Sequence, residues 1–79
     1  MSVTTSAPIF IKATFNGLNG SGSVSVPGLQ VNDVIVSWVN GNWESSFEYP
    51  VITVNDQIQQ LSGSNLSAIT FTVILLRWP

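Results

Sequence analysis

The residues that could support acid–base catalysis are four carboxylates, because the 79-residue chain contains neither histidine nor cysteine. Glu44 and Glu48 are the two that a regular strand would place on one face. Four residues along a strand span roughly 13 Å, which is too far for the paired carboxylates that act from opposite sides of a sugar in glycosidases. We therefore interpret Glu44 and Glu48 as part of a solvated strand face.

Asp33 and Asp56 each follow an asparagine at an expected turn, where a short carboxylate commonly caps the local backbone. Calcium would need six or more oxygen ligands, and no acidic loop in the sequence gathers them. The usual zinc ligands, cysteine and histidine, are absent. The sequence therefore predicts a protein that is not an enzyme, has no catalytic residues and binds neither a metal ion nor another cofactor.

Aromatic side chains gather around the segment Asn40-Gly41-Asn42, and they are the one feature that could form a ligand site. A flat ring flanked by amides suits a sugar, because the ring stacks on the sugar and the amides bind its hydroxyls. The candidate glycan platform consists of Trp43, Tyr49 and Asn42. Trp43 directly follows the turn, so we expect it either in the protein's own core or on a contact surface.

The elements that must position these residues are strands, because the apolar runs alternate with period two. We expect an all-β fold with an N-terminal arm (1–8) and one β domain (9–79). A small β-sandwich or barrel of six to seven antiparallel strands fits the turn spacing, with Ig-like and jelly-roll topologies both open. The expected strands are 9–15, 23–26, 31–39, 43–49, 51–54 and 67–78, while 56–60 is a short strand, a loop or a helical turn.

Two turns punctuate the middle of the chain. Pro27-Gly28 fits the centre of a type II turn, since proline presets φ and glycine accepts a positive φ. Asn40-Gly41 predicts a type I′ hairpin that returns the chain into 43–49. Between them, Val34, Val36 and Trp38 alternate on one face, so we expect Trp38 in the core.

The final strand is apolar on both faces. One face carries Ile69, Phe71, Val73 and Leu75, and the opposite face carries large apolar residues as well. A thin domain can bury only one of these faces against its own core, so the other should meet another subunit or the folded-back N-terminal arm, of which we favour the subunit. The candidate subunit interface consists of Ile74, Leu76 and Trp78, with Trp43 at the hairpin.

The composition also favours assembly. Only 8% of the residues are charged, against roughly a quarter in a typical soluble domain. Lys12 and Arg77 are the only cations, too few for a nucleic-acid surface. No segment has the length of a transmembrane helix, and the first residues lack the features of a signal peptide, so we expect synthesis in a cytoplasm. A small domain without disulfides or metal commonly gains stability by oligomerisation.

Two segments, VPGLQVNDVIV (26–36) and LSAITFT (66–72), resemble small virion structural proteins of tailed bacteriophages. The resemblance implies a homo-oligomeric capsid decoration or head-associated protein, located in the virion and bound to the major capsid protein or other virion proteins. It transfers no catalytic or ligand residues. The alternatives are a small carbohydrate-binding module on a fibre or tail, and a β scaffold with no partner of its own.

Overall fold

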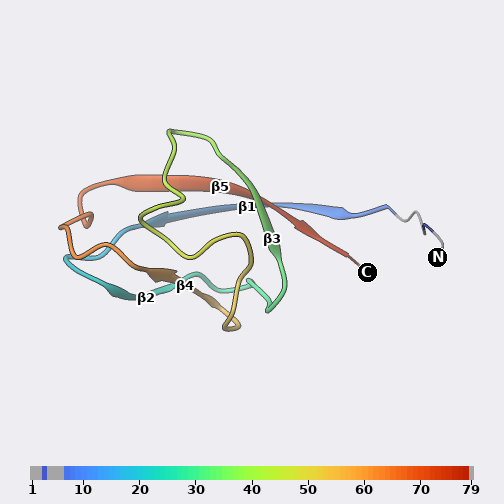
Figure 1. Cartoon of the computed structure of the whole chain (residues 1–79), viewed down its shortest axis with the longest axis horizontal. Coiled ribbons are helices and arrows are strands. Elements are labelled where there is room, and N and C mark those ends of the chain that lie inside the picture. The colour runs from blue at the N-terminus through green and yellow to red at the C-terminus, as the bar shows by residue number, and fades with distance from the viewer. Residues whose placement is uncertain (1–2, 4–6, 79) are drawn as a thin grey trace.

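The computed structural model describes Val3 and residues 7–78, and this part of the chain is all-β (Figure 1). It forms five strands in two antiparallel sheets, a three-stranded sheet in the order β1-β5-β3 and a two-stranded sheet of β2 and β4. The strands are β1 (Ile9–Asn16), β2 (Gly22–Ser25), β3 (Val34–Trp38), β4 (Gln57–Gln60) and β5 (Thr70–Arg77).

The predicted fold class is confirmed at this level. Neither sheet closes into a barrel within the described residues, and a sandwich of Ig-like or jelly-roll order stays a prediction. Most of the expected N-terminal arm (1–8), and Pro79 at the end of the expected domain (9–79), lie outside the described residues. Nowhere in residues 7–78 is there a helix long and apolar enough to cross a membrane.

β5 is the central strand of the larger sheet. It pairs with β1 without interruption from Ile9–Arg77 to Asn16–Thr70, and it pairs with β3 along its other edge. Its core face is completely buried over Phe71, Val73 and Leu75, as the period-two pattern predicts. In Figure 1, β1 and β5 run side by side along the long axis of the molecule.

A β-bulge in β3 corrects the predicted alternation of that strand. Ile35 pairs with Leu75 and Ser37 with Ile74, so Val36 is an extra residue without a partner. The extra residue shifts the alternation by one position, so that Ile35 and Trp38 both face the core. Trp38 is buried as predicted, but Val36 does not share its face and is half exposed.

The return strand expected over 43–49 does not form. The side-chain amide of Asn40 donates to the carbonyl of Thr70 at 2.7 Å and accepts the amide of Thr72 at 3.2 Å, so it extends the pairing of β3 to β5. Gly41 has a positive φ but Asn40 does not, which excludes the type I′ hairpin. The segment that follows makes one isolated bridge, from Phe47 to Gln60.

The strand expected over 51–54 is also absent, because Val51 and Val54 make only single bridges to Val34 and Gln57. The open alternative over 56–60 resolves as β4. These differences leave five strands instead of six or seven. The Pro27-Gly28 turn does form, with a positive φ at Gly28 and a hydrogen bond from the amide of Leu29 to the carbonyl of Val26.

An aromatic cluster around Phe71 fills the core. The ring of Phe71 contacts four others, with centroid distances of 4.8 Å to Trp43, 5.0 Å to Phe47, 5.7 Å to Phe15 and 6.2 Å to Trp38. These rings come from β1, β3, β5 and the 43–49 segment, so the cluster joins parts of the chain that are distant in sequence. Both sheets contribute to the same core, the smaller one through Val24 of β2 and Ile58 of β4.

Gln60 is a buried polar residue that joins β4 to two loops. Its side-chain oxygen accepts the amide of Leu18 at 2.7 Å, and its nitrogen donates to the carbonyls of Leu18, Ser62 and Ser64. Every hydrogen-bonding group of this amide has a partner, which is the condition for burying a polar side chain at low cost. Gln60 therefore fixes the loops beside the aromatic cluster.

Replacing Phe71 with alanine should lower the free energy of unfolding by about 3–5 kcal/mol, because it removes a ring that touches four others and leaves a cavity. Chemical denaturation of the purified protein measures this loss. The control is Val36→Ala at the bulge, which should change the free energy of unfolding by less than about 0.5–1 kcal/mol. Equal losses in the two variants would contradict a core centred on Phe71.

Candidate functional site

The face of the three-stranded sheet that lies opposite the aromatic cluster is the candidate functional site, and we call it the open face. Its central residues are Ile74 and Leu76 of β5, which alternate with the buried residues of that strand. Both are only half-buried in the described structure. The second face of this strand therefore carries apolar side chains outside the core cluster, and their contact with another subunit stays a prediction.

Strand pairing arranges the open face in rows that cross the sheet. Leu76 lies between Phe10 of β1 and Val34 of β3, which makes a row of three apolar side chains from three adjacent strands. In the next row Ile74 lies between Lys12 and Ser37. The side chain of Phe10 is 70% exposed, so the first row ends in a large aromatic group available to another surface.

The structure separates the four residues of the predicted subunit interface. Ile74 and Leu76 share the open face, and Trp78 lies just beyond the end of β5 with 54% of its surface exposed. Trp43 does not join them, because its ring packs edge-on against Phe71 on the core side of β5. Of the two positions expected for Trp43, the structure shows the core. Phe10 is not among the four predicted interface residues, although its alternation with Lys12 and Thr14 indicates that it faces outward.

The three residues of the candidate glycan platform differ in their burial and in their contacts. The Trp43 ring is turned toward the core, and its indole nitrogen lies so close to Gly41 that a Cβ there would be 2.8 Å away. Tyr49 is exposed, and the side-chain amide of Asn42 lies against the carboxylate of Glu44. Trp43 is therefore partly buried while Tyr49 is exposed, and the glycan platform stays a prediction.

The interpretation of Glu44 and Glu48 as one solvated strand face is wrong for Glu48. Glu44 is exposed, but Glu48 is buried and accepts hydrogen bonds from the hydroxyl of Thr53 at 2.6 Å and the backbone amide of Gln59 at 3.3 Å. The absence of a regular strand over 43–49 explains the difference, because the alternation that would place both carboxylates on one face is not present.

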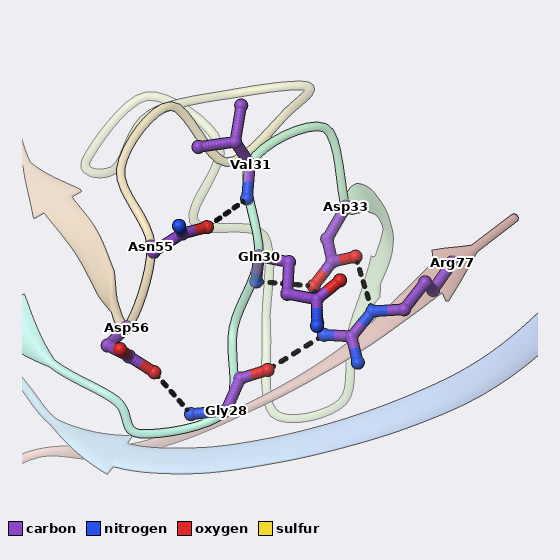
Figure 2. Close-up of polar contacts among 7 residues, drawn as sticks. All are labelled: Gly28, Gln30, Val31, Asp33, Asn55, Asp56 and Arg77. Carbon is purple, nitrogen blue, oxygen red and sulfur yellow. Dashed lines mark hydrogen bonds and ion pairs between the residues drawn. The ribbon is translucent and has the colours of Figure 1, made fainter. Parts of the chain in front are cut away.

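Asp33, which is buried, and Arg77, which is partly exposed, form an ion pair that fixes the end of β5 (Figure 2). The Arg77 guanidinium donates to both carboxylate oxygens of Asp33, at 2.7 and 2.9 Å, and to the carbonyl of Gly28 at 2.7 Å. Asp33 also accepts the backbone amide of Gln30 at 2.9 Å, which is the local cap expected from the sequence. The pair therefore joins β5 to the loop between β2 and β3.

Asp56 holds the same loop from the other side. Its carboxylate accepts the amide of Gly28 at 2.8 Å, and the neighbouring Asn55 side chain accepts the amide of Val31 at 2.9 Å, as Figure 2 shows. Asp56 therefore caps a segment 28 residues away and not its own turn, where it has a positive φ. The ion pair itself was missed from the sequence, although Arg77 is one of only two cations that could neutralise a buried carboxylate.

Opposing effects act on the pKa of Asp33. Burial raises the pKa, but the hydrogen bonds from Arg77 and from the Gln30 amide, together with the attraction of the guanidinium charge, lower it by more. The net pKa of Asp33 therefore lies below its usual value. A depressed carboxylate pKa stabilises the folded state at pH values above the pKa of the unfolded chain, about 3.9, and this stability is lost as the pH falls further.

Asp33→Asn should therefore reduce the free energy of unfolding at neutral pH, and the difference from the natural chain should shrink as the pH falls below about 4. Urea denaturation at a series of pH values measures this difference. Glu44→Gln makes the same chemical change at an exposed position and serves as the control. A deficit for Asp33→Asn that stays constant down to pH values well below about 4 would contradict the stabilising role of the ionised carboxylate.

No pocket and no group of three potential metal ligands occurs among residues 7–78. The open face joins apolar side chains from three adjacent strands of the larger sheet. No protein-family model, curated protein or solved structure matches the chain.

Proposed function

We propose that this protein is a structural protein that self-assembles and binds neighbouring subunits through the open face. The observation that carries the proposal is the row of Phe10, Leu76 and Val34 across three adjacent strands. When another surface covers apolar side chains on one face of a sheet, the free energy falls by about 25 cal/mol per Å² of apolar surface removed from water. A contiguous row of this kind on a regular sheet is typical of a protein contact surface.

The charge distribution supports a contact with protein. Lys12 is the one charged residue among the described side chains of the two rows, and the rest are aliphatic, aromatic or hydroxyl-bearing. Interface centres are depleted in charge and enriched in aromatic anchors, which matches the composition of the open face around Phe10. The ion pair between Asp33 and Arg77 keeps the other cation occupied within the chain.

For the biological setting, we propose a capsid decoration or other head-associated protein of a bacteriophage virion, with the two sheets packed as a small sandwich. The sequence resemblance over 26–36 and 66–72 supports this setting. A surface rich in serine, threonine, asparagine and glutamine, with few charges, suits close packing of identical copies because it generates little electrostatic repulsion. In such a particle the open face would meet the same surface of another copy or a capsid subunit.

Phe10→Lys should shift the protein toward monomer in size-exclusion chromatography with light scattering, because it replaces the exposed aromatic group of the proposed contact with a charge. The matched control is Leu61→Lys, since Leu61 is 62% exposed but lies after β4, away from the open face. A natural chain that is monomeric at every concentration, or equal dissociation of both variants, would overturn the proposed role of the open face.

A further inference from the structure

The outer edge of β1 is the longest unpaired strand edge in the described part of the chain, since β1 has eight residues and β2 only four. The shorter edges of β3 and β4 each make backbone contacts with another segment. The amide of Ile35 in β3 donates to the carbonyl of Pro50 at 2.7 Å, and the amide of Glu48 donates to the carbonyl of Gln59 in β4 at 2.9 Å. Among residues 7–78, the free sides of β3 and β4 are thus partly paired, whereas that of β1, the bare edge, has no backbone partner.

The direction of the free hydrogen-bonding groups on β1 follows from the register. Gly17 directly follows β1, and its amide donates to the carbonyl of Ile69, which directly precedes β5. Every second residue before Gly17 therefore also points its backbone amide and carbonyl toward β5. On β5 the carbonyl of Thr72 accepts the amide of Val39, so the backbone carbonyl of Thr72 points toward the β3 side and not toward β1. The amides and carbonyls that point to the bare edge are therefore those of Phe10, Lys12, Thr14 and Asn16.

β1 carries only one of the features with which natural sheets protect an edge, the charged side chain of Lys12. Protected edges are short, bulged, interrupted by proline, or carry charged side chains, lysine above all, including charges that point inward. The register of β1 against β5 is unbroken over Ile9–Asn16, and Pro8 lies before the strand. Lys12 is exposed on the open face beside Ile74 and does not point into the sheet.

We propose that a second copy of this chain pairs with the bare edge, β1 against β1 in antiparallel orientation, about a twofold axis. The inference rests on the proposed self-assembly and adds its geometry. An antiparallel strand pair is self-complementary, because the same residues supply donors and acceptors on both sides. Pairing joins the two three-stranded sheets into one continuous sheet and places the two open faces side by side.

The sequence of β1 distinguishes between the two registers that give nearly full overlap. One register places Lys12 opposite Lys12 of the second copy, so that like charges face each other, and aligns Pro8 with Asn16, where proline has no amide to donate. This register is disfavoured on both counts.

The other register places Ala13 on the twofold axis. Lys12 then lies opposite Thr14 of the second copy, and Phe10 lies opposite Asn16. All four edge-facing residues find a partner with a free amide and carbonyl, and no like charges oppose each other. We therefore assign the dimer to the register centred on Ala13.

Cysteine cross-linking tests this register directly, because the natural chain has no cysteine. The double variant Lys12→Cys with Thr14→Cys should form a covalent dimer under mild oxidation, since paired strand residues approach to about 5.5 Å between Cα atoms, within the range of a disulfide. Neither single variant should cross-link above background. A covalent dimer from Lys12→Cys alone would overturn the assigned register in favour of the one centred on Lys12.

Thr14→Pro removes one edge-facing amide from each copy while leaving the amides that pair with β5 intact. It should raise the dissociation constant of the dimer at least about tenfold, because both copies carry the substitution and two hydrogen bonds are lost at once. Thr14→Val is the matched control, since it keeps the amide and loses only the hydroxyl contact with Thr72. Circular dichroism of both variants tests whether the monomer remains folded. If Thr14→Pro does not fold, the cysteine cross-linking experiment alone decides whether the strands pair.

The two proposals fail differently in these experiments. If the natural chain is oligomeric, Phe10→Lys dissociates it, and the double cysteine variant does not cross-link, then the strand pairing is wrong and the open-face function stands. If the double variant cross-links and Thr14→Pro dissociates the dimer while Phe10→Lys does not, then the strand pairing is upheld and the open-face function is wrong. A natural chain that is always monomeric overturns both.

Discussion

The structure depends on one constraint, which is that β5 must satisfy neighbours on both of its edges and on one of its faces at the same time. It pairs with β1 along its full length and with β3 across a bulge, so it occupies the centre of the larger sheet. Its core face supplies Phe71, around which the other aromatic rings are packed. Because the core lies on one side of β5, the apolar residues on its other side remain for external contacts.

The elements with strong period-two patterns could be predicted from the sequence, whereas irregular elements could not. The burial of Phe71, Val73 and Leu75 follows from simple alternation. The bulge at Val36 has no such signal, since β-branched residues are equally suited to either face of a strand. The prediction that Trp38 is buried is therefore confirmed, but the alternation with Val34 and Val36 from which it follows is not present in β3.

Side-chain hydrogen bonds account for the remaining differences. Asn40 was interpreted through its tolerance of positive φ, but its amide instead extends β3 by pairing with Thr70 and Thr72. Glu48 and Gln60 are buried because backbone groups distant in sequence satisfy them. Such partners depend on tertiary structure, so the residue type alone indicates exposure. The ion pair between Asp33 and Arg77 is the same kind of long-range relation.

Not every buried polar group in the described residues is satisfied. The indole nitrogens of Trp38 and Trp43 are buried without a hydrogen-bond partner. An unmade hydrogen bond of this kind costs roughly 1–3 kcal/mol, which the packing of the rings against Phe47 and Phe71 must exceed. The aromatic cluster is therefore held by ring contacts and apolar burial, without directional bonds from its tryptophans.

The pairing of Ile9 with Arg77 has a mechanical consequence. The chain enters β1 and leaves β5 at the same end of a shared antiparallel ladder. A pull applied through the segments before Ile9 and after Arg77 would load the rungs of this ladder one at a time, peeling the two strands apart instead of shearing them. The contact of Arg77 with Asp33 lies at that first rung, so the ion pair would bear tension before any β1–β5 rung deeper in the sheet did.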